Sequence, residues 1–185
     1  MKQVAVFLDR DGTINEEMGY INHLSRFRLL PEAAPAIRRL NEAGLKVVVI
    51  TNQSGAARGY FPPSLVELVH EHMRELLARE GARLDGIYAF LHGPGDNCSC
   101  RKPKPGLIFQ AAEDLSLDLP RSYLVGDRYV DVDTALQAGV KPLLVLTGYG
   151  LGEYEQFHAV REAKPLGVAH NLLEAAAFIL ADLKK

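Results

Sequence analysis

The sequence predicts an α/β fold in which helices cover both faces of a parallel sheet. Short apolar runs alternate along the chain with longer amphipathic stretches, and the composition is that of a globular protein, with 48% apolar and 24% charged residues. Alternating strands and helices favour parallel strands, because each crossover helix packs on a face of the sheet. The length of 185 residues fits one domain, so we expect residues 1–185 to form a single unit.

Five apolar runs have the composition of buried strands, since they are short, partly β-branched and apolar on both faces. These predicted strands are Val4–Leu8, Val47–Ile50, Ile87–Leu91, Tyr123–Val125 and Leu143–Leu146. Five other stretches place apolar residues at helical spacing. These predicted helices are Ala33–Ala43, Ser64–Glu80, Leu107–Leu115, Val130–Ala138 and Leu172–Leu183. We expect irregular structure over Asn15–Leu30, Gly93–Gly106 and Gly148–Pro165.

Charge and cysteine content narrow the function classes. The net charge of -2 argues against a nucleic-acid partner, and no apolar run approaches the ~20 residues that a membrane span needs. The apolar start is short and we interpret it as a first strand. A disulfide between Cys98 and Cys100 would close a strained loop, so we expect a reduced, cytoplasmic protein whose cysteines are metal ligands or bystanders.

Polar residues follow the predicted strands, where an open α/β sheet binds its ligand. Asp9-Arg10-Asp11-Gly12-Thr13 comes directly after the first strand. One carboxylate there can attack phosphorus or bind a hard cation, and a second can act as general acid and base. A polar turn is the plain structural alternative, because Asp and Gly are common in turns.

Three later strands are followed by groups that suit a phosphoryl substrate. Hydroxyl and amide side chains of Thr51–Gly55 can donate to phosphoryl oxygens, and the cations of Arg101–Gly106 can neutralise them. Asp127 stands at a strand end as a candidate metal ligand, with Asp131 one turn later to support it. Each group alone has a structural reading as a cap or a solvated turn, but the four together indicate a phosphatase.

In this order the motifs resemble those of the haloacid dehalogenase (HAD) superfamily of aspartate-nucleophile phosphotransferases. Four segments are similar to the D-glycero-D-manno-heptose 1,7-bisphosphate phosphatases and to the related histidinol-phosphate phosphatases. They are Phe7–Asn15, Gly19-Tyr20, Thr51–Gly59 and Cys98–Pro103. The resemblance implies a Rossmann-like parallel sheet with no large cap domain, in which loops form the substrate pocket.

The resemblance also implies roles for individual residues. Asp9 would be the nucleophile and Asp11 the general acid and base, while Thr51 and Lys102 would hold the phosphoryl oxygens. Mg²⁺ would bind Asp9, the backbone carbonyl of Asp11, and Asp127. Asp131 would support these ligands without binding the ion itself. The substrate would be bound by Gly19, Tyr20, Asn52, Gln53, Ser54, Arg101 and Arg128.

The sequence departs from the family pattern in the zinc-binding loop. His92, Cys98 and Cys100 match three of its four ligand positions, but Phe90 stands at the fourth and cannot ligate. Structural zinc sites are nearly always closed by four protein ligands, so we favour a loop without zinc. The alternative is that the three ligands hold zinc with water or Asp96 as the fourth ligand.

The sequence therefore predicts a Mg²⁺-dependent phosphatase that forms an aspartyl-phosphate. Heptose 1,7-bisphosphate, cleaved at its 7-phosphate, is the favoured substrate, and histidinol phosphate is the alternative. A phospho-accepting receiver-like signalling module is a second class, but such modules lack a carboxylate two residues after the phosphorylated aspartate. We expect a monomer acting on a small molecule, with no nucleic-acid or membrane partner.

Two further groups are expected to be structural. His70 and His72 lie two residues apart on a predicted helix and cannot face one partner, so we expect them to be solvated or packed. Tyr149, Tyr154 and Phe157 could form a wall of the pocket, but we expect them to pack a late loop onto the sheet.

Overall fold

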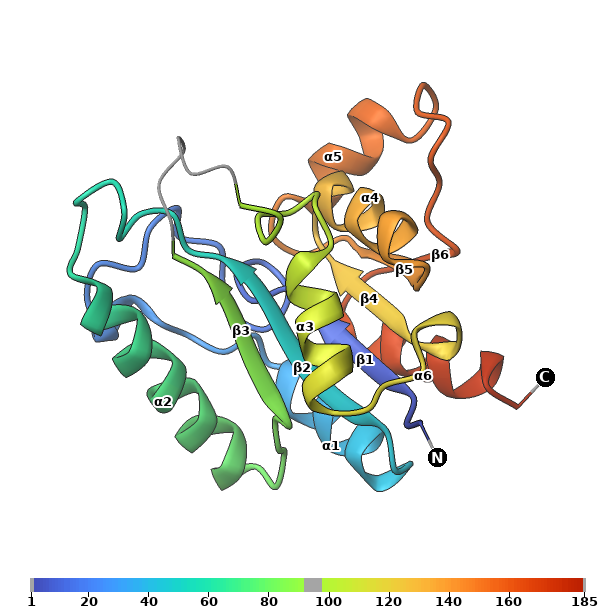
Figure 1. Cartoon of the computed structure of the whole chain (residues 1–185), viewed down its shortest axis with the longest axis horizontal. Helices are drawn as coiled ribbons and strands as arrows, with labels where there is room; N and C mark the ends of the chain where they lie inside the picture. The colour runs from blue at the N-terminus through green and yellow to red at the C-terminus, as the bar shows by residue number, and fades with distance from the viewer. Residues whose placement is uncertain (1, 92–97, 185) are drawn as a thin grey trace.

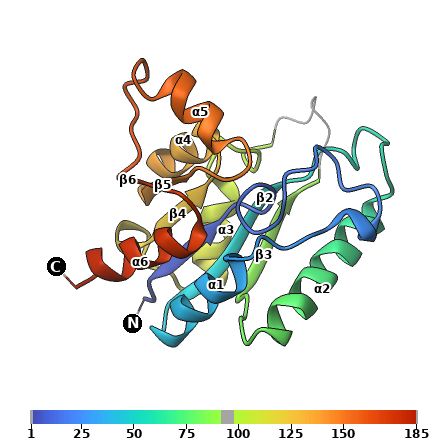
Figure 2. The same cartoon turned by 180° about the vertical axis from the view of Figure 1, so that it is seen from behind.

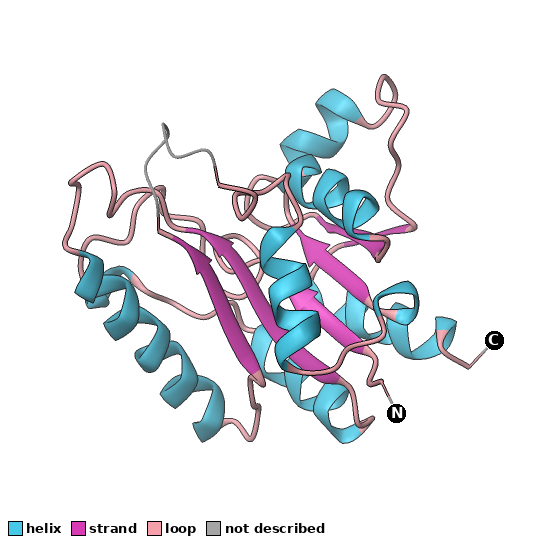
Figure 3. Ribbon diagram, viewed as in Figure 1, coloured by secondary structure: helices cyan, strands magenta, loops and turns pink. Residues whose placement is uncertain are grey.

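The computed structural model describes residues 2–91 and 98–184 and contains a six-stranded sheet in which all neighbouring strands are parallel. The strand order is β3-β2-β1-β4-β5-β6. This confirms the predicted α/β fold (Figure 1, Figure 3). The strands are β1 (Ala5–Leu8), β2 (Lys46–Asn52), β3 (Gly86–Phe90), β4 (Tyr123–Gly126), β5 (Lys141–Val145) and β6 (Gly167–Ala169).

Helices lie on both faces of the sheet, and β1 is buried along its whole length at the centre. Figures 1 and 2 show α3 in front of the sheet, with α1 and α6 behind it. The helices are α1 (Ala33–Glu42), α2 (Pro63–Arg79), α3 (Gly106–Asp114), α4 (Tyr129–Ala138), α5 (Gly150–Phe157) and α6 (Leu172–Asp182). Two short 3-10 helices cover Leu24–Arg26 and Leu119–Arg121.

Alternate residues of β1 enter two separate apolar cores, as the pleat of a strand requires. Val6 and Leu8 pack with α1, α2 and α6, whereas Ala5 and Phe7 pack with α3 and α4. Because both faces of β1 are buried, packing on both sides fixes its carboxyl end in place. The residue there, Asp9, is therefore held by a rigid part of the fold.

One strand and one α-helix were not predicted from the sequence, and both belong to the last third of the chain. Strand β6 has three residues at the sheet edge, which is too short for a period-2 pattern. Helix α5 contains Gly150 and Gly152, which are poor helix formers, within the stretch expected to be irregular. Tertiary packing selects this helix, since Tyr154 and Phe157 pack against a cluster of Tyr129, Val132 and Leu144.

Over the part of the chain that the structure describes, helices are too short or too polar to cross a bilayer.

Candidate active site

The carboxyl ends of β1, β2 and β4 meet at one edge of the sheet, and the polar residues that follow them line one cavity. The crossover after β1 leads to β2, and the crossover after the neighbouring β4 leads in the opposite direction to β5. Open α/β sheets bind ligands at such a switch point. The cavity has a volume of about 330 Å³. Its lining is Asp9, Asp11, Glu17, Gly19, Tyr20, Thr51, Asn52, Ser54, Arg101, Lys102, Asp127, Arg128, Val130 and Tyr149.

Lys102 bridges two carboxylates in the floor of this cavity. Its Nζ lies 2.8 Å from Asp9 Oδ1 and 2.6 Å from Asp131 Oδ1, and the side chain is 3% exposed. Burial opposes the charged form, but the carboxylates of Asp131 and Asp9 raise the pKa of Lys102 above its usual value. The ammonium is therefore a permanent positive charge beside Asp9.

Three buried carboxylates share this single lysine. Oxygen atoms of Asp9, Asp127 and Asp131 lie within 4.8 Å of one another. Burial raises the pKa of Asp9 to about 7 against the opposing pull of Lys102. Burial, followed by the charges of Asp9 and Asp131, raises the pKa of Asp127 to about 8. The site thus carries more negative charge than Lys102 neutralises, which favours binding of a further cation.

The oxygens of these carboxylates differ in their hydrogen-bond partners. Asp131 Oδ1 accepts from Lys102, and its Oδ2 accepts from the backbone N–H of Arg128 at 3.3 Å. Asp127 Oδ2 accepts from the backbone N–H of Tyr149 at 2.8 Å. Its buried Oδ1 has no hydrogen-bond partner among the described residues. An ionised oxygen in that position is costly unless a cation binds it, so Asp9 and Asp127 fit a Mg²⁺ site.

Two glycines leave the room that Asp127 occupies. A Cβ on Gly12 would lie 2.1 Å from Asp127 Oδ2, and one on Gly148 would lie 2.2 Å from the same atom. Gly12 also has a φ of +79°, which residues other than glycine rarely adopt. Both glycines therefore let two loops approach the carboxylate closely.

Asp11 is held by three side chains. Arg10 Nη2 donates to Asp11 Oδ1 at 2.8 Å and to Oδ2 at 2.7 Å. Asn15 donates to Oδ1 at 2.9 Å, and Gln53 donates to Oδ2 at 2.8 Å. Burial alone would raise the pKa of Asp11, but the Arg10 charge and these hydrogen bonds lower it below its usual value. The carboxylate is thus oriented and held in its ionised form.

Comparisons with known proteins agree with this geometry. A HAD-hydrolase-like family model matches residues 99–175. The D-glycero-beta-D-manno-heptose-1,7-bisphosphate 7-phosphatase of Pseudomonas aeruginosa is 42% identical over 152 residues, covering 82% of this chain and 85% of that protein. The D-glycero-D-manno-heptose-1,7-bisphosphate 7-phosphatase of Thermosynechococcus vestitus is 40% identical, covering 99% of this chain and 98% of that protein.

The chain belongs to this family of HAD-type phosphatases. A crystal structure of D,D-heptose 1,7-bisphosphate phosphatase from B. bronchiseptica, complexed with magnesium and phosphate, superposes with a TM-score of 0.88 at 37% identity. It covers 98% of this chain and 99% of that one. The fold and the hydrolase activity predicted from the sequence are thereby confirmed.

Of the residues that the sequence marked for catalysis, magnesium and substrate, all but Gln53 line the phosphatase cavity. Gln53 is 7% exposed and donates to Thr51 Oγ1 at 2.9 Å as well as to Asp11, so it contacts other side chains of the site rather than the cavity. At the carboxyl end of β2, Thr51 and Gln53 point to the same side because side chains alternate along an extended chain. Asn52, between them, accepts from the backbone N–H of Lys102 at 3.2 Å.

Glu17 and Val130 line the cavity without having been predicted, and Tyr149 lines it against the favoured expectation. Glu17 lies in a loop where no periodicity applies, and its Oε1 accepts from the backbone N–H of Gly19 at 2.6 Å. The expectation for Tyr149 was wrong: its ring faces the Arg128 guanidinium at 5.1 Å and forms part of the wall. Tyr154 and Phe157 do pack onto the fold as expected.

The two cysteines correct another expectation. The structure joins Cys98 and Cys100 in a disulfide, so they are not the reduced thiols that the sequence suggested. The turn between them places their Cα atoms 5.2 Å apart, a separation that a disulfide spans. The third candidate zinc ligand, His92, lies outside the described residues. Phe90 is buried, and the Arg101 guanidinium lies 5.7 Å from its ring centroid.

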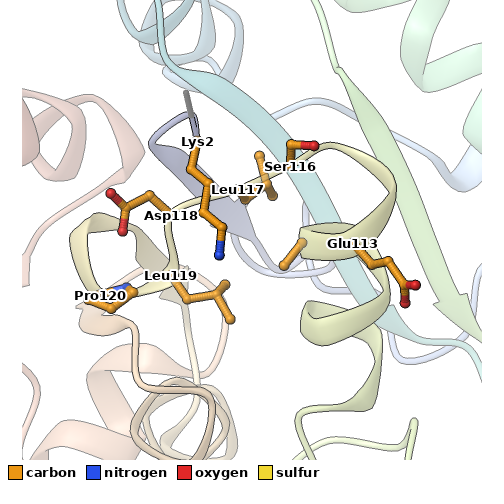
Figure 4. Close-up of a pocket in the computed structure, with 8 residues that line it drawn as sticks. Lys2, Glu113, Ser116, Leu117, Asp118, Leu119 and Pro120 are labelled. Atoms are coloured by element: carbon orange, nitrogen blue, oxygen red, sulfur yellow. The ribbon is translucent and has the colours of Figure 1, made fainter.

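A second hollow, of about 760 Å³, lies at the opposite end of the sheet (Figure 4). Its lining includes Lys2, before β1, and Ser116–Pro120, before β4. It therefore lies at the amino ends of the central strands, away from the carboxylates and Lys102. Its larger volume does not make it the site of phosphate chemistry. Its described lining holds no buried ion pair like that of Asp9 and Lys102.

Proposed function

We propose that this phosphatase hydrolyses the 7-phosphate of D-glycero-D-manno-heptose 1,7-bisphosphate, with residues 1–185 acting as one domain. The observation that carries the proposal is the pair of carboxylates, Asp9 and Asp11, in the same cavity as Lys102. The names of relatives that match along most of this chain supply the substrate.

In the first step an oxygen of Asp9 attacks phosphorus, and the bond from phosphorus to the sugar oxygen breaks. Asp11 takes up a proton as the substrate binds and donates it to the departing oxygen, and an aspartyl-phosphate forms on Asp9. Lys102 and the Thr51 hydroxyl neutralise and hold the phosphoryl oxygens, which carry the charge of the transition state.

In the second step Asp11, now ionised, takes a proton from a water molecule that attacks phosphorus. The bond between phosphorus and Asp9 breaks, and both carboxylates return to their starting state. Asp11 lies two residues from Asp9 and lines the same cavity, so one side chain can serve both steps.

Asp9, Asp127 and the backbone carbonyl of Asp11 would hold Mg²⁺. Bound there, Mg²⁺ would supply positive charge that shields the phosphoryl group from the Asp9 carboxylate. Asp131 holds Lys102 instead of the cation, because its Oδ1 is 2.6 Å from the ammonium nitrogen. Zinc has no role in this proposal, and the zinc content of the purified protein tests that point.

The cavity wall suits a polar substrate with more than one anionic group. Arg101 and Arg128 line it together with Tyr20 and Tyr149, and Arg128 is also held by Glu153 at 3.3 Å. We infer that these cations bind the part of the substrate that is not cleaved. We propose a monomer acting on a small cytoplasmic metabolite, and the net charge of -2 supports the absence of a nucleic-acid partner.

The test is phosphate release with Mg²⁺ from both anomers of heptose 1,7-bisphosphate, histidinol phosphate, fructose 1,6-bisphosphate and p-nitrophenyl phosphate. A kcat/KM for one heptose anomer at least tenfold above all other substrates supports the proposal. Preference for histidinol phosphate would overturn the proposed substrate but not the proposed mechanism. Absence of phosphate release from every substrate would overturn both.

A further inference from the structure

Arg10 connects the general acid and base to a helix outside the cavity. Its side chain is 2% exposed, and its Nη2 donates to both oxygens of Asp11. Its other terminal nitrogen, Nη1, lies 3.3 Å from Nε2 of His70. The guanidinium thus lies between a carboxylate of the active site and an imidazole of α2.

The direction of the second hydrogen bond follows from chemistry. A guanidinium only donates, so His70 Nε2 must accept and the ring proton must be on Nδ1. Burial, followed by the charge of Arg10, lowers the pKa of His70 to about 4. The ring is therefore neutral at physiological pH and has the lone pair that this contact needs.

His70 is placed by the buried face of α2. Val66, Val69 and Met73 are buried on that face, and His70 lies beside them at helical spacing. His72, two residues on, points elsewhere and has its ring 6.0 Å from that of Phe27. His70 is not among the residues that line the cavity, so it does not touch the substrate.

The orientation of the guanidinium depends on few contacts. Arg10 Nε is buried and has no hydrogen-bond partner within the described part of the chain. Asp11 holds one end of the group and His70 holds the other. Without His70, the guanidinium would be fixed only by the carboxylate that it is meant to orient.

We propose that His70 is a positioning residue of the phosphatase, acting through Arg10 on the carboxylate of Asp11. The proposal rests on the proposed function only in taking Asp11 as the general acid and base. It gives α2 a part in the chemistry, although α2 contributes no residue to the cavity wall. His70, expected from the sequence to be solvated or packed, then has a role in the reaction.

The experiment compares leaving groups, because a structural defect would affect all of them equally. Nitrophenolate departs without a proton, whereas the sugar oxygen needs one from Asp11. Because kcat/KM covers the steps up to loss of the leaving group, it isolates the acid role. The probes are p-nitrophenyl phosphate and the preferred anomer of heptose 1,7-bisphosphate. The variants are His70→Leu, His70→Gln, which keeps an acceptor, and the control His72→Leu.

We expect His70→Leu to lower kcat/KM roughly tenfold or more for the sugar phosphate and less than about threefold for the aryl phosphate. His70→Gln should recover most of the loss, and His72→Leu should change neither value. In an Asp11→Asn background, His70→Leu should cause no further loss. Equal losses on both substrates, no loss at all, or a persistent effect in that background would overturn the inference.

Two further measurements separate the possible failures. Nitrogen NMR of the wild-type His70 ring must show the proton on Nδ1, and a proton on Nε2 would overturn the inference even if His70→Leu does not fold. If the wild-type protein hydrolyses both probes and the His70 variants match it, the inference fails and the proposed function stands. If the wild-type protein hydrolyses neither probe, the proposed function itself fails.

Discussion

Substituting Gly12 by alanine should destroy the magnesium site while leaving most of the fold intact. The new Cβ would lie 2.1 Å from Asp127 Oδ2. The carboxylate would have to move by about 1 Å to restore an ordinary contact, and Mg²⁺ requires ligand distances near 2.0–2.1 Å in an octahedron. A misplacement of that size costs about 100-fold in rate, so we expect kcat/KM to fall by at least that factor.

Gly139→Ala is the matched control for backbone strain. Gly139 has φ of +71°, close to the +79° of Gly12, but a Cβ on it would meet nothing within 4 Å. Each substitution should cost about 1–2 kcal/mol for the left-handed backbone, which corresponds to roughly 2–8 °C in Tm for a protein of this size. Only Gly12→Ala carries the additional contact with Asp127.

The assay measures Tm with EDTA and with Mg²⁺, together with phosphate release. Mg²⁺ should raise the Tm of the wild-type protein and of Gly139→Ala, and should leave that of Gly12→Ala unchanged. If Gly12→Ala keeps Mg²⁺-dependent activity within tenfold of Gly139→Ala, the assignment of Asp127 as a metal ligand is refuted.

Three other variants and conditions test the remaining parts of the site. Asp9→Asn should abolish turnover because an amide is a poor nucleophile, and a substantial rate of phosphate release would contradict this. Asp11→Asn should slow both half-reactions in rapid-quench assays yet keep Mg²⁺ affinity by calorimetry, since the proposed ligand is its backbone carbonyl; lost affinity would count against that ligand. In EDTA, the folded-state pKa values of Asp9 and Asp127 lie above the unfolded value of 3.8. The contribution of Asp9 and Asp127 to stability should therefore be full below about pH 4 and be lost as pH rises through about 7–8. Tm measured from pH 4 upward should show this decline, Asp127→Asn should weaken it, and a flat Tm profile would refute it.

The sequence predicted the sheet and the catalytic edge because both depend on local patterns. Apolar runs mark buried parallel strands, and a polar residue directly after each run must lie at the carboxyl edge. Asp9, Thr51 and Asp127 could be placed in this way without knowledge of any contact. Family resemblance then added the distinction between Asp127 and Asp131, which the geometry supports through the bond from Asp131 to Lys102.

The parts that the sequence did not reveal depend on long-range contacts. His70 and Arg10 are 60 residues apart, and no periodicity indicates that they meet. Glu17 and Tyr149 reach the cavity from loops whose paths are set by tertiary packing. The disulfide between Cys98 and Cys100 depends on a turn that the sequence pattern did not specify.

The central claim is that Asp9 becomes phosphorylated during turnover. The most direct measurement mixes excess substrate with Asp11→Asn protein and Mg²⁺, quenches in acid, and maps phosphorylated peptides by mass spectrometry. Our account predicts one phosphoryl group on the peptide that contains Asp9, lost on treatment with hydroxylamine as an acyl phosphate should be. Turnover without such a label, or a label on a different residue, would contradict it.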